Sequence, residues 1–297
     1  MGEVKGELAA LVAAFFWAVS SAIYGILGEK VRPLELNFLK GTIAIALLIF
    51  TLFLAGEIDF SYSSSAIILL VSGAIGIGLG DTAYFLTINN LGVRKSLLME
   101  NLTPPMTATL GLIFLSETLS YGAWCGIFIT LLGVAWVISE RTNVAETTDD
   151  RAFKRGIIWG ILANLLQAVG GILSRFALVD SDITPLQSTF LRLMGGMAII
   201  ILLLAIDRSA IKNIYSQKSF KQTGAIFIAA FGGTYLGIWL QQTAYKFTAA
   251  GIASTLTSTS PLFILPIALA MGDKISFRAI LGALLALAGI GLLFTYS

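Results

Sequence analysis

Two carboxylates lie inside long apolar stretches of the sequence, where charge is expensive. They are Asp81, at the end of a glycine-rich run, and Glu100, which Asn101 follows. A charged side chain at membrane depth costs roughly 3 kcal/mol or more, so such groups usually have a function. A carboxylate there can bind an amine, accept a coupling proton or pair with a cation on another helix. The structural alternatives are a salt bridge for Asp81 and an interfacial pair with Arg94 or Lys95 for Glu100.

Two basic residues, Lys40 and Arg192, occupy matching places near the starts of their apolar stretches. Long basic side chains can extend toward lipid headgroups, and we expect this role for both. The alternatives are that they neutralise an anionic substrate, or that they hold Asp81 or Glu100.

Prolines interrupt two of the apolar stretches. Pro104, Pro105 and Pro261 lack the amide hydrogen that a helix interior needs, and they predict helix breaks. Broken helices at corresponding places in two halves of a chain are typical of a transport site. Hydroxyl residues that share one helical face with Pro261 are expected to line a cavity or to bond to carbonyls one turn back: Ser254, Thr257 and Ser258.

The composition predicts the environment in which these groups work. Hydrophobic residues form 57% of the 297 residues and charged residues 12%, whereas soluble domains carry roughly 25% charged residues. The chain is therefore expected to be an all-α membrane protein with the lipid bilayer as its partner. The net charge of +2, without a basic stripe, predicts no nucleic-acid partner. The absence of histidine excludes imidazole catalysis and imidazole metal sites, and we expect no enzyme activity, no cofactor and no metal.

Ten stretches are apolar enough to cross a bilayer as helices, since crossing takes about 20 residues. Those that contain Lys40 and Glu100 are the weakest. The stretches are 7–27, 35–55, 66–89, 96–116, 120–139, 156–178, 186–206, 223–246, 251–271 and 276–296.

An internal repeat divides the chain into residues 1–140, a polar linker at 141–155 and residues 156–297. Phe38-Leu39-Lys40 is echoed by Phe190-Leu191-Arg192, and Thr82-Ala83-Tyr84 recurs as Thr243-Ala244-Tyr245. Pro105, Glu117, Gly126 and Gly133 are matched at one constant offset by Pro261, Asp273, Gly282 and Gly289. Five helices per half is an odd number, so the second half is expected to be inverted relative to the first.

The repeat also suggests which polar residues face one another. Through the recurring tripeptide, Asp81 corresponds to Gln242, and Trp17 corresponds to Gln167 as the second wall of one pocket. The further candidates for binding a substrate or a coupling ion are Tyr84, Asn164 and Gln241. The paired glycines Gly126 to Gly133 and Gly282 to Gly289 are expected to let helices approach closely, in the chain or in a homodimer.

The arrangement resembles the drug/metabolite transporter superfamily, in particular its ten-helix EamA-type members, over nearly the whole chain. The resemblance depends on Lys40 and Arg192, on the Pro105 and Pro261 helices and on the glycine-rich helices that follow. It implies a secondary carrier, often an exporter, with a central cavity lined by both halves. It implies no particular substrate.

The orientation is predicted differently by two arguments. Most lysines and arginines flanking the ten helices lie in the connections 1–2, 3–4, 5–6, 7–8 and 9–10. Since flanking positive charge collects in the cytoplasm, both termini should lie outside. The family resemblance implies cytoplasmic termini instead. In either case we expect a multi-pass protein of the prokaryotic cell (inner) membrane.

Three functions fit these observations. The favoured one is a secondary transporter, with alternating access, proton coupling and export as its expected features, for a small metabolite such as an amino acid or another zwitterion. An intramembrane aspartyl protease is the second, because Gly78-Leu79-Gly80-Asp81 matches the Gly-x-Gly-Asp pattern; that chemistry needs a second carboxylate. The third is a non-transporting channel or scaffold.

Overall fold

The computed structural model describes residues 2–27, 33–59, 63–91, 93–140, 150–179, 181–206, 220–270 and 276–296. Eight helical stretches within these ranges are long and apolar enough to cross a membrane. They are α1 (Gly2–Leu27), α2 (Pro33–Ala55), the run from Ser64 to Leu91, α7 (Tyr121–Glu140), α8 (Asp150–Val179), α9 (Pro185–Ile206), the run from Phe220 to Phe247, and α15 (Phe277–Tyr296). Helix α8 includes residues 150–155 of the predicted linker.

The other two passages are pairs of short helices. One pair is α5 (Val93–Glu100) and α6 (Thr103–Phe114), and the other is α13 (Ala250–Thr257) and α14 (Ser260–Ala270). Pro104 and Pro261 each stand second in the helix that follows the break, where a missing amide hydrogen costs nothing. The predicted helix breaks are therefore confirmed, and the ten predicted passages are present in two inverted groups of five.

The third passage of each half contains a π-helical segment, which the sequence did not predict. The first consists of α3 (Ser64–Gly73), η1 (Ala74–Gly80) and α4 (Asp81–Leu91), and the second of α11 (Phe220–Ala229), η2 (Ala230–Leu236) and α12 (Gly237–Phe247). π-Helical segments inside α-helices often occur at functional sites. Here each ends in the middle of the bundle.

The helix bounds correct one predicted correspondence. The elements that begin at 64, 74, 81 and 121 recur at 220, 230, 237 and 277, each 156 residues later. The counterpart of Asp81 is therefore Gly237, not Gln242. The repeated Thr-Ala-Tyr tripeptide lies 161 residues apart (82 to 243), so it does not mark equivalent positions. A literal match of three residues is weaker evidence for equivalent positions than the register of whole helices.

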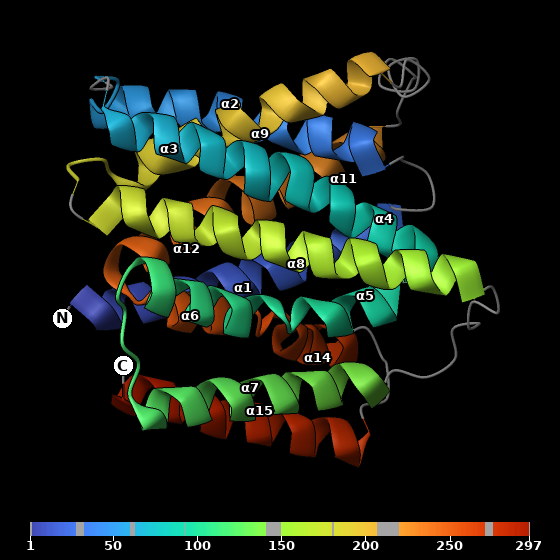
Figure 1. Ribbon diagram of the computed structural model, residues 1–297. Helices are drawn as coiled ribbons and strands as arrows, with labels where there is room; N and C mark the ends of the chain where they lie inside the picture. The colour runs from blue at the N-terminus through green and yellow to red at the C-terminus, as the bar shows by residue number, and fades with distance from the viewer. Residues whose placement is uncertain are drawn as a thin grey trace.

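Figure 1 shows that the two halves run in opposite directions: α1 begins at the end of the bundle where both termini lie, and α8 begins at the other end. We call these ends the termini face and the opposite face. The last residues of α2, α6 (Thr103–Phe114), α8 and α12 and the first residues of α3, α7, α9 and α13 lie at the termini face. About half of the basic residues that predict the orientation in the membrane lie outside the described ranges, and that orientation stays a prediction.

Helices α7 and α15 form a closely packed pair at one edge of the bundle (Figure 1). A Cβ added at Gly126 would lie 3.0 Å from the carbonyl oxygen of Gly289, and one at Gly282 would lie 3.1 Å from that of Gly133. The four paired glycines thus bring two helices of this chain together, as expected for helix packing.

The surface of the bundle is apolar and part of its interior is polar. Phe50, Phe53 and Leu54 on α2 are 61–68% exposed. In contrast, Glu35 and Gln242 are buried. This distribution suits a solvent of lipid, which favours apolar side chains outside and leaves polar groups to be satisfied within.

Candidate functional site

A cavity of about 350 Å³ lies at the centre of the bundle, between the two halves. Its size is that of a site for a small organic molecule. Most of the polar residues selected from the sequence line it: Trp17, Lys40, Asp81, Tyr84, Glu100, Asn101, Asn164, Gln167, Arg192, Gln241, Ser254, Thr257, Ser258 and Pro261. These residues come mainly from α1, α2, α4, α5, α8, α9, α12, α13 and α14, and Thr103 adds α6, so both halves contribute.

Asp81, the first residue of α4, joins three helices. Its Oδ1 accepts a hydrogen bond from Gln167 Nε2 on α8 at 2.9 Å, and its Oδ2 lies 3.6 Å from Lys40 Nζ on α2. Lys40 therefore does not extend to the headgroups as expected; the alternative, that it holds Asp81, is correct. An ion pair forms because a carboxylate and an ammonium face each other where water is scarce.

Glu100 ends α5 at the break before α6 and lines the same cavity. Its carboxylate accepts a hydrogen bond from the Tyr84 hydroxyl on α4. The interfacial pairs with Arg94 or Lys95 involve side chains outside the described set. Both selected carboxylates thus reach one cavity, and Asp81 is the only aspartate among its described lining residues.

The broken helices are tied to α8 and to each other by hydroxyl groups. Thr103 Oγ1 donates to Asn164 Oδ1 at 2.6 Å, and Asn164 Nδ2 donates to the Gly160 carbonyl at 2.6 Å. Thr107 Oγ1 donates to the Thr103 carbonyl at 2.8 Å and lies 3.5 Å from Ser254 Oγ, across the two breaks. These contacts join α6 of one half to α13 of the other, so the prolines and hydroxyls position the cavity wall.

The hydroxyls of α13 have both of the expected roles. Thr257 Oγ1 donates to the Ala253 carbonyl at 3.0 Å, and Ser258 Oγ donates to the Ser254 carbonyl at 2.9 Å. Both residues also line the cavity. Bonds of this kind satisfy carbonyls at a helix end and leave the hydroxyl oxygen free to accept.

Three selected residues do not line the cavity. Gln242 is fully buried, and its Oε1 accepts a hydrogen bond from Ser188 Oγ on α9 at 2.9 Å. Pro104 and Pro105 shape α6 without reaching the cavity surface. Gln242 was selected through the tripeptide match, which explains why it lies one and a half turns away from the Asp81 position.

Arg192 is the second basic residue of the cavity. Its side chain is 3% exposed, which contradicts the expected position at the headgroups. A Cβ at Gly76 would lie 3.1 Å from Arg192 Nη2, so the glycine makes room for the guanidinium. Unlike Lys40, Arg192 makes no ion pair within the described ranges.

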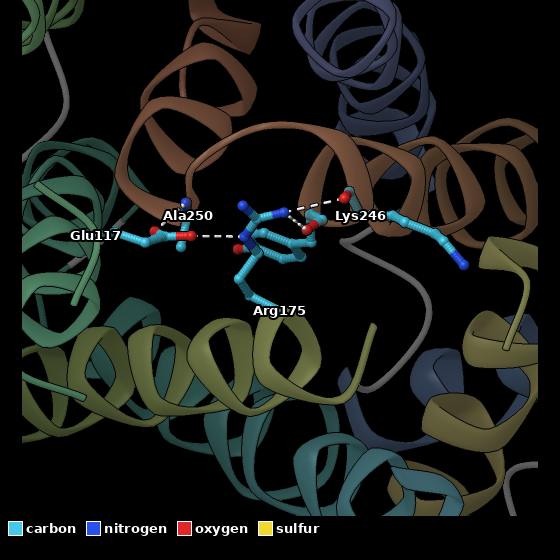
Figure 2. A network of polar contacts seen from close by, with 5 residues as sticks. Glu117, Arg175, Lys246 and Ala250 are labelled. Atoms are coloured by element: carbon cyan, nitrogen blue, oxygen red, sulfur yellow. Dashed lines mark hydrogen bonds and ion pairs between the residues drawn. The ribbon is translucent and has the colours of Figure 1, made fainter. Parts of the chain in front are cut away.

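A polar network links the helix ends at the termini face, and sequence reasoning missed it. Figure 2 shows Glu117, after α6, facing Arg175 on α8: Arg175 Nε donates to Glu117 Oε1 at 2.6 Å, and Arg175 Nη1 donates to the carbonyls of Tyr245 and Lys246 at 2.8 and 3.0 Å. Glu117 Oε2 accepts from the Ala250 amide at 2.9 Å.

Glu117 lies at the turn between α6 and α7, close in sequence to Ser120. It caps α13, whose first amide it binds, while Ser120 Oγ accepts from the Ala123 amide at the start of α7. A carboxylate at a helix N-terminus is favoured by the helix dipole. The available signal was Arg175, a charged residue near the end of an apolar stretch with no acidic residue three or four positions away on its helix.

The comparisons with known proteins agree with this architecture. Residues 4–139 and 154–295 each match the EamA-like transporter family. The chain is 26% identical over 253 residues to the uncharacterized transporter YyaM of Bacillus subtilis (strain 168), covering 84% of this chain and 80% of that protein. A solved crystal structure with 15% identity covers 99% of this chain and 98% of its own, with a TM-score of 0.79, and so supports the fold. With the family matched in both halves, this multi-pass membrane protein belongs to the EamA-like transporter family.

Proposed function

We propose that this chain is a secondary transporter that exports a small metabolite across the cell (inner) membrane of a prokaryote by alternating access. The observation that carries the proposal is the central cavity of about 350 Å³, to which both inverted halves contribute charged and polar side chains. Inverted repeats with broken helices at matching places are the usual framework of such carriers, whose sites lie near the midplane.

The polar network at the termini face supports alternating access. There Glu117 and Arg175 bind α8, α12 and α13 together. A carrier must open each face in turn, so this network would have to break in the state that is open to the termini face. A permanently open pore needs no such network.

The charges of the cavity support a zwitterion such as an amino acid as the substrate. Lys40 and Arg192 supply two positive charges, and Asp81 and Glu100 two negative ones. Either carboxylate is also able to carry a coupling proton. The protease alternative needs two carboxylates that share a proton, whereas the Asp81 oxygens face Gln167 and Lys40 and the Glu100 carboxylate is bound by the Tyr84 hydroxyl.

The test is transport by the purified protein in proteoliposomes. A panel of amino acids and other metabolites is loaded inside or outside, with and without a proton gradient. We expect saturable movement of at least one solute and a change in its rate when the gradient is collapsed. The proposal would be contradicted if no solute in the panel is transported, or if the protein conducts ions with single-channel steps.

The direction is tested in cells. Metabolites are compared in cells with and without the protein, because an exporter lowers its substrate inside and raises it in the medium. A higher internal level in cells that contain the protein would show import instead.

A further inference from the structure

Arg192 is a buried cation whose hydrogen-bond donors are unfilled. Its side chain is 3% exposed, yet it lines the central cavity. Neither Nε nor Nη1 has a hydrogen-bond partner in the described chain. A buried ion normally requires an opposite charge and hydrogen bonds, because desolvation costs several kcal/mol. Unfilled buried donors of this kind call for an explanation.

The acidic groups of the cavity are already engaged. Asp81 attracts the guanidinium of Arg192 electrostatically, but its two oxygens face Gln167 Nε2 and Lys40 Nζ. The Glu100 carboxylate is bound by the Tyr84 hydroxyl. Of the two cavity cations, Lys40 thus has an acidic partner and Arg192 lacks one.

The repeat explains why the partner is missing. Lys40 and Arg192 are the eighth residues of α2 and α9, which both begin at a proline. Asp81 and Gly237 are the first residues of α4 and α12. The first half therefore contains a complete ion pair, and the second half contains the cation with glycine in place of the acid.

We propose that Arg192 binds the carboxylate of the transported solute, an inference that rests on the proposed function and names the chemistry of its substrate. The guanidinium offers planar, paired donors that match a carboxylate. One unpaired positive charge is neutralised by one carboxylate, whereas a dianion such as phosphate would leave a second buried charge uncompensated.

The position of Arg192 also orients the solute. Arg192 lies seven residues after Pro185, about 10 Å along α9 from the termini face, and Glu100 lies seven residues after Val93, about 10 Å along α5 from the opposite face. The carboxylate end of a zwitterion therefore points toward the termini face, where Gln167 and Tyr245 also line the cavity, and its cationic end points toward Glu100.

The first experiment changes the solute and leaves the protein intact. Proteoliposomes containing the full chain are tested with leucine, phenylalanine, threonine and lysine. Each is compared with its methyl ester and with the amine that lacks the carboxylate. We expect the free acids, and not the esters or amines, to compete for transport and to stabilise the detergent-solubilised protein against heat.

The second experiment changes Arg192. R192Q should raise the half-saturating concentration of the transported acid by about 30-fold or more, the usual effect of removing one partner of a buried charge pair. R192K keeps the charge and loses the paired donors, so it should show a smaller increase. The matched control is R278Q, which removes an exposed cation of α15 away from the cavity. Esters and amines should bind as weakly to R192Q as to the unaltered protein.

The outcomes separate this inference from the proposed function. If some solute is transported but esters and acids compete equally, or if R192Q binds the acid as tightly as the unaltered protein, the carboxylate inference is wrong and the transporter stands. If R192Q does not fold, the comparison of acids with esters on the unaltered protein still tests the carboxylate inference. If no solute moves at all, the proposed function fails and the inference fails with it.

Discussion

The two halves of the bundle share their backbone and differ in the side chains at its centre. At the end of η1, Asp81 meets Gln167 and Lys40. At the end of η2 the corresponding residue is Gly237, and Trp17, the counterpart of Gln167, packs over it: a Cβ at Gly237 would lie 2.5 Å from Trp17 Nε1. The indole donates to the Gly233 carbonyl at 2.8 Å. The first half thus has a polar cluster around Asp81, whereas the second half has the Trp17 ring packed against Gly237.

The difference shows how a repeated backbone obtains a directional site. Two identical halves would give a cavity that is equally charged toward both faces. Here the substituted residues leave Lys40, Asp81 and Glu100 on one side and an unpaired Arg192 on the other. The two faces of the bundle differ as well, because Arg175 links helix ends at the termini face while its counterpart, 150 positions earlier, is Gly25.

The largest effect is expected where the first half has glycine and the second has alanine. A Cβ at Gly73 would overlap the backbone of Arg192, whereas its counterpart Ala229 is accommodated. Gly73→Ala should therefore separate α3 from α9 and destabilise the protein by about 3 kcal/mol or more. Thermal unfolding in detergent measures this. Gly224→Ala, on a helix face with open space, is the control and should be neutral or slightly stabilising.

A smaller effect should follow from making the two faces alike. Arg175→Gln removes the ion pair with Glu117 and leaves the carbonyls of Tyr245 and Lys246 unpaired, at a cost of about 2 kcal/mol. The termini face should open more often.

Labelling of one cysteine in the cavity measures this opening. In a Cys125→Ala background, Ser254→Cys should react up to about 30-fold faster with an impermeant thiol reagent applied at the termini face, since about 2 kcal/mol corresponds to that factor. Vesicles of both orientations identify the face. An unchanged rate would mean that the network does not control access.

The polar cluster of the first half is tested by Asp81→Asn. The amide keeps the shape and loses the charge that holds Lys40, so transport of the identified solute should fall about tenfold or more, with normal membrane insertion. Lys40→Gln is the companion variant and should give a similar loss. Retained transport with an unchanged response to the proton gradient would remove Asp81 from the mechanism.

Much of this fold was readable from the sequence, because hydrophobic length, prolines and an ordered repeat are local properties. The helix breaks at Pro104 and Pro261 and the close helix approach at the paired glycines follow from residue type and spacing, although the sequence left open whether Gly126 packs within the chain or in a homodimer. The π-helical segments were not predictable, since they leave the apolar composition unchanged. The predicted position of the Lys40 and Arg192 side chains at the headgroups was wrong, because hydropathy indicates how deep a residue lies in the membrane and not whether it faces lipid or a cavity.

The contacts of the site were less predictable, because they join distant parts of the chain. Arg175 and Glu117 are 58 residues apart, and Gln167 and Asp81 are 86 apart. Only the register of the repeat hints at such pairs, and the Thr-Ala-Tyr match misread it by five residues at Asp81. Helix bounds, once known, correct the register and reveal Gly237.

The smallest net change is expected when the second half is given the chemistry of the first. Gly237→Asp alone should be destabilising, because the new side chain collides with Trp17. Trp17→Gln alone loses a large packed ring and its bond to Gly233. Each single variant should cost about 1–3 kcal/mol in thermal unfolding.

The double variant recreates the Asp81–Gln167 arrangement and supplies a carboxylate near Arg192, the counterpart of Lys40. Its stability should therefore lie within about 1 kcal/mol of that of the unaltered protein. The double variant should also bind the free acid more weakly, because the new carboxylate competes for Arg192. Additive losses would show that the two halves differ in backbone as well as in side chains.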